Sequence, residues 1–296
     1  MINTVTGKIK KSELGRVLMH EHVICTSHEF QDFPGWLDRS IIVPVAVEKI
    51  KYVSENFGIK TIIDATPQIL GRNLDLLKEI SEKSEVQIIA STGFYFYQSF
   101  SQTRVKPETI AAFMLEEIKN GKICPGFLKC AVDFPGITKN VEFALQTMAI
   151  VQKESSLPLY MHSNAATRSG IPALKLLSEA GVPAEKIIVG HVSDNNDLSY
   201  ALELLSSGVN IAVDRVNNNN PKFVYDVINK GFEDRTFMSH DHICCYDRIM
   251  EGIYQGEPHG LDIVTGKYFP ELQHMGVAME ILEKIITKNV EKLFII

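Results

Sequence analysis

Short runs of apolar residues alternate along the chain with longer stretches in which apolar positions recur at helical spacing. The short runs are rich in Val and Ile and hold few polar residues, which is typical of strands buried on both faces of a parallel sheet. We expect strands at residues 17–22, 60–65, 86–91, 127–131, 157–162, 187–191, 209–214 and 235–239.

The longer stretches predict helices. Leu74, Leu77 and Ile80, for example, recur at i, i+3 and i+6 and would share one face of a helix. Residues 23–44 contain Pro34-Gly35-Trp36 and predict a long loop after the first strand. We expect helices at residues 44–56, 70–83, 107–120, 140–154, 171–180, 198–206, 222–230, 278–286 and 290–294.

This alternation predicts the fold class. Eight strands that alternate with helices over about 250 residues indicate an α/β fold, a closed (β/α)8 barrel of the TIM type. No linker, low-complexity tract or block of charge interrupts the pattern, so residues 1–296 are expected to form a single domain.

Composition narrows the possible partners and location. The formal charge of −6 argues against nucleic acid or an anionic membrane surface as a partner. No apolar run approaches the roughly 20 residues that span a bilayer, and the polar first residues do not resemble a secretory signal. The five cysteines form no CxxC motif, so reduced thiols and a cytoplasmic location are expected. The partner that we expect is a small-molecule substrate.

Residues with metal-binding or proton-transfer chemistry stand where the predicted strands end. His20 and His22 would share one face of the first strand, while Glu21 would point to the opposite side. The later strands end near Lys129, His162, His191 and Asp241. In a barrel these ends converge on one mouth, where active sites lie. The histidines at 28, 240, 242, 259 and 274 follow this pattern less well, and we interpret them as loop or surface residues.

Four histidines and an aspartate offer ligands that suit Zn, Mn, Co or Fe rather than Ca. Four histidines exceed the need of one catalytic metal ion, and two ions would need a bridging anion. Lys129 could supply it only as a carbamate formed with CO2, because an ammonium group has no lone pair. A lysine that reaches an acidic partner is the alternative, and the residues alone leave both open.

The ordered motifs at residues 4–9, 14–22, 126–129, 189–194 and 197–200 resemble those of the phosphotriesterase family of the amidohydrolase superfamily. The resemblance covers essentially the whole chain. It implies that two divalent metal ions, expected to be Zn, are held in the barrel mouth. One would be bound by His20, His22 and Asp241 and the other by His162 and His191, with N6-carboxylysine at Lys129 and a hydroxide between them.

The resemblance also implies a reaction. The hydroxide would attack a carbonyl or phosphoryl centre, and Asp241 would take or relay a proton to the leaving group. Members of the family are commonly dimers, so we expect a homodimer.

Two features indicate a lactone substrate. The aromatic loop at residues 92–97 resembles that of the phosphotriesterase-like lactonases, in which a tyrosine hydroxyl approaches the hydroxide. Tyr95 aligns with that tyrosine and Tyr97 is the second choice. Asp214-Arg215 resembles their Asp-Arg pair, which places the arginine near the substrate. Catalytic roles are thus predicted for Asp241, Tyr95 and Arg215, and substrate binding for Tyr95, Tyr97, Arg215, Lys222 and Arg248.

The chain departs from one subgroup of the family. Enzymes that hydrolyse phosphorylated sugar lactones carry an arginine four residues and a tyrosine seven residues after the metal-binding aspartate, where this chain has Cys245 and Arg248. The phosphate-binding pair is therefore altered, although Lys222 and Arg248 could supply charge by another route. Cys244-Cys245 is itself a departure, and residues 247–266 are expected to cover the mouth.

We therefore expect a lactonase with promiscuous phosphotriesterase activity. The first alternative is an amidohydrolase that acts on a carboxylic ester, an amide or a phosphorylated sugar lactone. The second is a barrel that binds metal without turnover.

Overall fold

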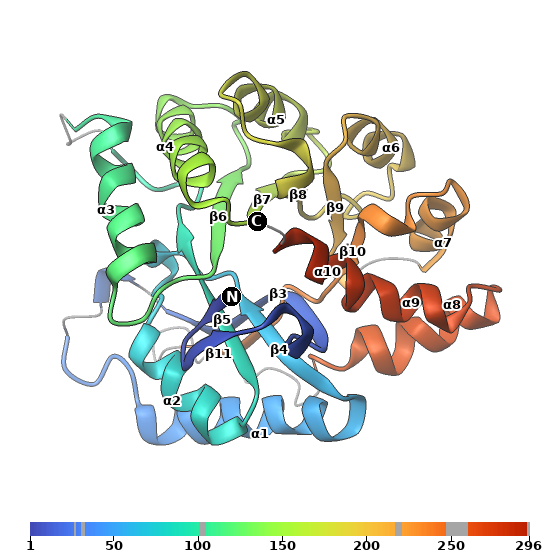
Figure 1. Cartoon of the computed structure of the whole chain (residues 1–296), viewed down its shortest axis with the longest axis horizontal. Coiled ribbons are helices and arrows are strands. Elements are labelled where there is room, and N and C mark those ends of the chain that lie inside the picture. Colours follow the sequence, from blue (N-terminus) through green and yellow to red (C-terminus); the bar gives the residue numbers. More distant parts are fainter. Residues whose placement is uncertain (27, 31–32, 101–104, 217–220, 247–259, 295–296) are drawn as a thin grey trace.

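A computed structural model of the chain describes residues 1–26, 28–30, 33–100, 105–216, 221–246 and 260–294 (Figure 1). Among these residues the main sheet follows the order β10-β9-β8-β7-β6-β5-β4-β3-β11, with neighbouring strands parallel. Its strands are β3 (Arg16–Cys25), β4 (Ile59–Asp64), β5 (Gln87–Gly93), β6 (Phe127–Val132), β7 (Leu159–Ser163), β8 (Ile187–Val189), β9 (Asn210–Val213), β10 (Thr236–Met238) and β11 (Ile243–Tyr246).

The segment from β10 to β11 closes the sheet into a barrel. The Ser239 N–H donates to the Val213 carbonyl of β9 at 3.2 Å, and the Asp241 N–H donates to the His20 carbonyl of β3 at 3.0 Å. β10 pairs with β9, and β11 pairs with β3. The two short strands thus act as one interrupted strand that joins the two sides of the sheet, and the predicted (β/α)8 barrel is confirmed.

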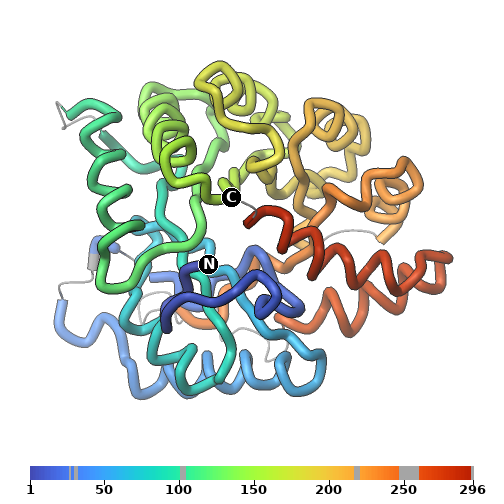
Figure 2. The backbone as a smooth tube through the Cα atoms, in the orientation of Figure 1, coloured from blue at the N-terminus to red at the C-terminus, as the bar shows by residue number. Residues whose placement is uncertain are grey.

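Helices surround the barrel on its outside (Figures 1 and 2). They are α1 (Arg39–Phe57), α2 (Leu74–Ser84), α3 (Pro107–Asn120), α4 (Lys139–Ser155), α5 (Gly170–Glu179), α6 (Leu198–Ser206), α7 (Pro221–Asn229), α8 (Phe269–His274), α9 (Met279–Ile286) and α10 (Lys288–Leu293). Shorter turns lie at Lys11–Glu13, His28–Phe30, Gln68–Leu70, Ala184–Lys186, Glu233–Arg235 and, as a π-helix, Val264–Tyr268. No helix of the described residues is long and apolar enough to cross a membrane.

Some predicted boundaries were wrong for local reasons. The expected loop at 23–44 is shorter, because β3 continues to Cys25 and α1 already begins at Arg39. The Asp38 side chain accepts a hydrogen bond from the Ser40 N–H at 3.0 Å, which caps the first turn of α1. In the predicted helix 70–83, Leu70 ends the short 3-10 turn Gln68–Leu70 instead, and α2 begins at Leu74.

Strand β11 and an N-terminal hairpin were not predicted. The hairpin pairs β1 (Ile2–Thr4) with β2 (Gly7–Ile9) in antiparallel fashion. β11 contains Cys244 and Cys245, which are buried in a core cluster with α1. The unusual cysteine pair therefore packs between the barrel and its first helix.

The interior of the barrel is filled from its amino-terminal end. Apolar side chains of the strands form a buried cluster, and Ile2 of the hairpin and Val290 and Leu293 of α10 belong to it. The N-terminus and α10 lie over the near end of the barrel in Figure 1. Because this end is packed, the polar residues at the carboxyl ends of the strands face the opposite mouth.

Phe127 is a sensitive probe of this interior. Its ring is fully buried, and the ring centroids of Tyr160 and Phe294 lie 6.4 and 6.5 Å away. We expect Phe127→Ala to lower the free energy of unfolding by about 3–5 kcal/mol, because it removes packed surface and leaves a cavity. The matched control is Phe113→Ala on α3, whose side chain is 71% exposed and whose loss should cost at most about 0.5 kcal/mol. Equal shifts in chemical denaturation would contradict this account of the core.

Candidate metal centre

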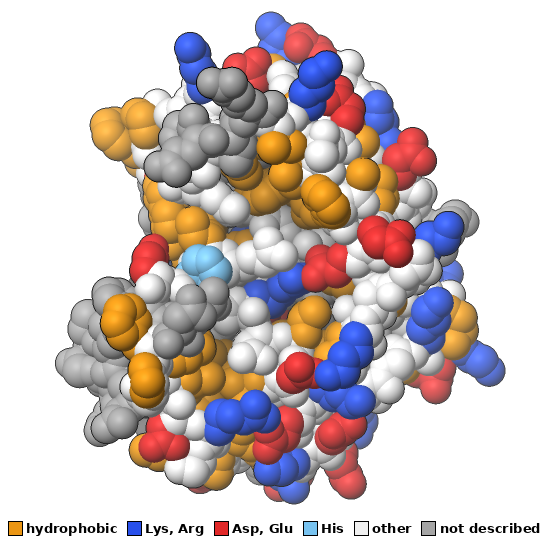
Figure 3. Space-filling view, turned by 90° about the vertical axis from the view of Figure 1, so that its left-hand side faces the viewer, with side chains coloured by type: hydrophobic (Ala, Val, Ile, Leu, Met, Phe, Trp, Pro, Cys, Tyr) orange, Lys and Arg blue, Asp and Glu red, His pale blue; other side chains and the backbone are white. Residues whose placement is uncertain are grey.

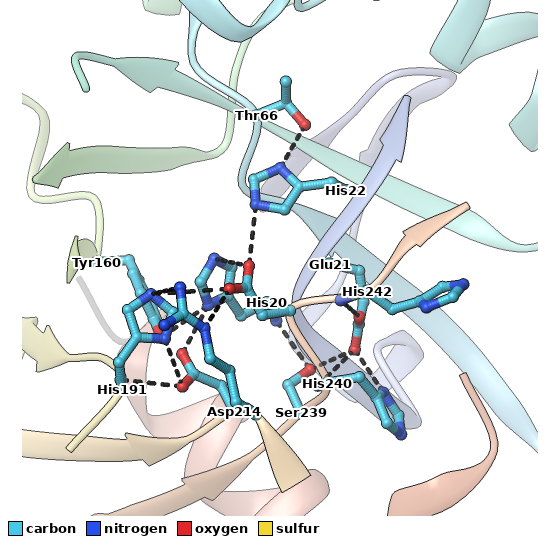
Figure 4. A network of polar contacts seen from close by, with 12 residues as sticks. His20, Glu21, His22, Thr66, Tyr160, His191, Asp214, Ser239, His240 and His242 are labelled. Carbon is cyan, nitrogen blue, oxygen red and sulfur yellow. Dashed lines mark hydrogen bonds and ion pairs between the residues drawn. The ribbon is translucent and has the colours of Figure 1, made fainter. Parts of the chain in front are cut away.

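Alternate residues of β3 direct two histidines into the barrel mouth (Figure 4). His20 and His22 are buried, and their Nε2 atoms lie 3.3 and 3.1 Å from Oδ1 of Asp241. One ligand atom of each of these residues lies within 4.8 Å of the others, so together they could hold a metal ion. The first and last strands of the barrel thus meet at this point.

A second pair of histidines lies beside the first. The ring centroids of His162 on β7 and His191 after β8 are 4.4 Å apart, and Nε2 of His191 lies 3.9 Å from Oδ2 of Asp241. Lys129 on β6 reaches the same place, with Nζ 2.8 Å from Nε2 of His20. The structure therefore brings all the sequence-predicted ligands together, while their role as ligands stays a prediction.

The environment of Lys129 raises the fraction of its neutral amine. The side chain is almost fully buried, with Nζ 4.4 Å from the ring centroid of Tyr160. Burial lowers the pKa of Lys129 to about 8, because a charged ammonium loses its hydration there. The neutral amine is the form that reacts with CO2, and the carbamate at Lys129 stays a prediction.

One carboxylate connects the two pairs of histidines. Asp214 follows β9 and is fully buried. Its Oδ2 lies 2.7 Å from Nδ1 of His20, and its Oδ1 lies 3.0 Å from Nδ1 of His191 and accepts from the His191 N–H at 2.9 Å. A cation in the mouth would keep the Asp214 carboxylate ionised, and an ionised carboxylate only accepts. Both rings would then carry their proton on Nδ1 and offer the Nε2 lone pair to the ion. Burial raises the pKa of Asp214 to about 8, an effect that a nearby cation would oppose.

The other two histidines also have partners on the nitrogen that faces away from the cluster. Nδ1 of His22 lies 2.8 Å from the Thr66 hydroxyl. Nε2 of His162 lies 2.7 Å from Oδ2 of Asp133, which leaves Nδ1 as the ring nitrogen with a lone pair. The hydrogen bond from His162 is the main reason why the pKa of Asp133 lies well below its usual value. Asp133 and Asp214 were missed as supporting residues, although each carboxylate follows a strand that ends at the mouth.

Two of these residues have unusual backbone conformations. Asp241 has φ of +53° and His191 has φ of +61°, in the left-handed region that residues other than glycine seldom adopt. Such conformations persist where surrounding contacts hold them, and they concentrate at functional sites. The expected strand 187–191 accordingly ends at Val189.

The predicted catalytic residues border the cluster. Arg215 donates from Nε to Oδ2 of Asp241 at 2.8 Å and from Nη1 to Asp194 at 2.7 Å. Asp241 and Asp194 raise the pKa of Arg215, against the effect of burial, so its guanidinium stays charged. The Tyr95 ring lies 5.3 Å from that of His162, and burial raises the pKa of the Tyr95 hydroxyl, which stays protonated.

The remaining predicted substrate residues lie farther out or outside the described part of the chain. Tyr97 contacts Tyr95 with ring centroids 5.2 Å apart and is half exposed, and burial of the rest raises its pKa to about 12. Lys222 lies exposed at the start of α7 and bonds Asp226 with a shortest distance of 2.5 Å. Arg248 and most of the expected covering loop lie outside the described residues. The substrate roles of these residues stay predictions.

The interpretation of His240 as a loop or surface histidine was wrong. Its side chain is buried, and Nδ1 lies 2.7 Å from Oε1 of Glu21. His242 is partly buried, whereas His28 and His274 are exposed as expected, and His259 lies outside the described residues. A single histidine in the sequence gives no signal that it bonds a carboxylate more than two hundred positions away.

Asp214→Asn tests the connecting role of this carboxylate. A carboxamide offers one acceptor oxygen, so one of the two Nδ1–H donors loses its partner and the free energy of unfolding falls by about 1–3 kcal/mol. Histidine ring ¹⁵N NMR of the metal-free protein, recorded above the pKa of Asp214, should then show that His20 or His191 no longer keeps its proton on Nδ1 alone. Asp226→Asn removes a carboxylate from an exposed pair and is the control. Unchanged ring signals in Asp214→Asn would exclude the connecting role.

Comparison with known proteins gives the context for this geometry. The family model that matches residues 1–294 is the one described as "Phosphotriesterase family". The chain is 29% identical to the phosphotriesterase homology protein of Mycobacterium tuberculosis, over 99% of this chain and 97% of that protein. It is 30% identical to the aryldialkylphosphatase of Saccharolobus solfataricus, over 97% and 96%. It is 24% identical to the N-acetyltaurine hydrolase of Xenopus tropicalis, again over 97% and 96%.

Proposed function

The chain belongs to the phosphotriesterase family, and we propose that it is a binuclear metal-dependent hydrolase that acts mainly on lactones and more weakly on phosphotriesters. Family membership and the hydrolase names of its relatives confirm the expectation of a hydrolytic enzyme. The observation that carries the finer proposal is the buried set of four histidines, Asp241 and Lys129 at one mouth of the barrel.

The hydrogen bonds on the outer nitrogens support the ligand assignment, because they leave the inner nitrogens for metal ions. His20, His22 and Asp241 would hold one divalent ion, and His162 and His191 the other, with carboxylated Lys129 between them. Zn is the expected metal, and Mn, Co or Fe would suit the same nitrogen and oxygen ligands. When bound, the ions supply Lewis acidity and make hydroxide accessible at neutral pH.

Asp241 is placed for two tasks. Its Oδ1 lies near the histidines of β3, while its Oδ2 accepts from Arg215 at 2.8 Å. We assign to Asp241 the transfer of a proton from the attacking water to the leaving group. Arg215 then holds Oδ2 and borders the place where a substrate oxygen would lie.

The walls of the mouth favour a lactone. Tyr95 and Phe96 lie against His162 with ring centroids 5.3 and 6.0 Å away, so an apolar ring could pack there while the Tyr95 hydroxyl approaches the reacting carbonyl. Figure 3 shows hydrophobic side chains gathered toward the left edge of the molecule, whereas charged side chains dominate the right. Tyr97 and Phe134, which follow β5 and β6, are 51% and 74% exposed and would extend an apolar surface for an acyl chain.

A phosphorylated sugar lactone has less support. Cys245 stands where the corresponding subgroup has a phosphate-binding arginine. Its thiol is buried and lies 3.6 Å from the Ile42 carbonyl on α1, in a core cluster. Amide hydrolysis is the second candidate, because a relative over nearly the whole chain is named N-acetyltaurine hydrolase.

A substrate panel tests the proposed specificity. Protein purified without chelators should contain about two ions per chain by elemental analysis. It should hydrolyse γ- and δ-lactones with a kcat/KM at least about 100-fold above that for a p-nitrophenyl phosphotriester, an N-acyl amide or a lactone phosphate. If the protein binds two ions but prefers the amide, the proposed substrate becomes an amide. If it binds two ions and turns over no substrate of the panel, the protein is a metal-binding barrel without turnover.

Lys129→Ala tests the bridging carbamate. Loss of the bridging anion should lower ion occupancy and reduce kcat/KM at least about 100-fold, since even supporting residues of a metal site contribute 10–100-fold. Short carboxylic acids that fill the space left by the Lys129 side chain should partly restore ion occupancy and kcat/KM. Lys49→Ala is the matched control, because Lys49 is a buried lysine whose Nζ donates to the Cys244 carbonyl at 2.9 Å, away from the ligands. Full ion occupancy in Lys129→Ala would rule out the bridge.

A further inference from the structure

Glu21 lies between the two histidines of β3, with its side chain on the opposite face of the strand (Figure 4). It is fully buried, which is rare for a glutamate unless its charge has partners. No step of the proposed reaction uses it, and its carboxylate does not reach the mouth.

The partners of Glu21 come from the segment that carries Asp241. Oε1 accepts from the Ser239 hydroxyl at 2.6 Å, from the His240 N–H at 3.1 Å and from Nδ1 of His240 at 2.7 Å. Oε2 accepts from the His242 N–H at 2.9 Å. The backbone N–H groups on both sides of Asp241 therefore end on one buried carboxylate.

Backbone N–H and carbonyl groups of β3 also form hydrogen bonds with residues 239–242. The His20 N–H donates to the Ser239 hydroxyl at 3.0 Å, the Asp241 N–H donates to the His20 carbonyl at 3.0 Å, and the His22 N–H donates to the His242 carbonyl at 2.8 Å. Asp241 itself has φ of +53°, a conformation that needs surrounding contacts to persist. Glu21 supplies contacts directly before and after it.

His240 extends this arrangement. The Val264 N–H donates to Nε2 of His240 at 3.0 Å, so Nε2 carries no proton. Nδ1 must then carry the proton and donate it to Glu21. The carboxylate thus connects β3 to residues 239–242 and, through one neutral imidazole, to the start of the π-helix.

We propose that Glu21 is a positioning residue that fixes the backbone around Asp241, so that the Asp241 carboxylate meets Nε2 of His20 and His22. The inference rests on the proposed metal assignment. It predicts that Glu21 governs the affinity of the ion held by Asp241 and the β3 histidines more than that of the ion held by His162 and His191.

Glu21→Gln tests the inference without leaving a cavity. The carboxamide keeps one acceptor and replaces the other by an NH2 group, which must face N–H or O–H donors of residues 239–242. We expect the affinity for one of the two ions to fall 10–100-fold and that for the other to stay within about threefold. The measurement is titration of the metal-free protein with Co²⁺, followed by visible absorption and elemental analysis.

Two further variants separate positioning from general instability. Ser239→Ala removes one donor to Glu21 and should weaken the same ion by a smaller factor. Thr61→Val removes a buried hydrogen bond from the Thr61 hydroxyl to the Leu14 carbonyl at 2.7 Å, at the far end of β4. It should lower the unfolding midpoint while both Co²⁺ affinities stay unchanged.

The outcomes distinguish this inference from the function on which it rests. Wild-type protein that binds no Co²⁺ would overturn both. Wild-type protein that binds two ions, with the same affinities in Glu21→Gln or with equal losses at both sites, would overturn the role of Glu21 alone. If Glu21→Gln does not fold, Ser239→Ala decides, because unchanged affinities in that variant would also overturn it.

Discussion

The mouth of this barrel depends on the hydrogen bonds that Asp214 accepts from two histidines. His20 on β3 and His191 after β8 come from different sides of the ring, and the buried Asp214 carboxylate lies between them at 2.7 and 3.0 Å. Buried imidazoles need such partners, because burial without a hydrogen bond is costly and leaves the tautomer undefined. One carboxyl group therefore connects both halves of the candidate centre and orients their imidazole rings.

The same principle explains the buried polar residues behind the other predicted ligands. His22 has the Thr66 hydroxyl, His162 has Asp133, and the backbone around Asp241 has Glu21. Apolar side chains fill the amino-terminal end of the barrel, so these polar groups lie at its carboxyl end. Each predicted ligand is thus oriented by a hydrogen bond to a residue from another strand. The site therefore has its geometry only after the barrel has closed.

This dependence sets what the sequence could predict. The alternation of apolar runs and helices predicts the barrel, and the position of each polar residue at a strand end predicts which side chains gather at the mouth, because both are local signals. The supporting residues follow from no local signal. Glu21 and Ser239 are 218 positions apart and His20 and Asp214 are 194 apart, and they meet only because the sheet closes into a barrel. The missed strand β11 has the same origin, since Cys244 and Cys245 become a strand only against β3 and α1. The early start of α1 is different, because it follows from the local cap by Asp38.

The position of Arg215 constrains how Asp241 can work. A charge-assisted hydrogen bond from a guanidinium stabilises an ionised carboxylate and makes it a poorer proton acceptor. Arg215 donates to Oδ2 of Asp241 and also to Asp194, so Oδ2 already has a charged donor. In the proposed reaction, a substrate oxygen that attracts the guanidinium would weaken this bond and so raise the basicity of Oδ2. Asp194 can hold the other end of the arginine meanwhile, which links the basicity of Asp241 to the presence of substrate.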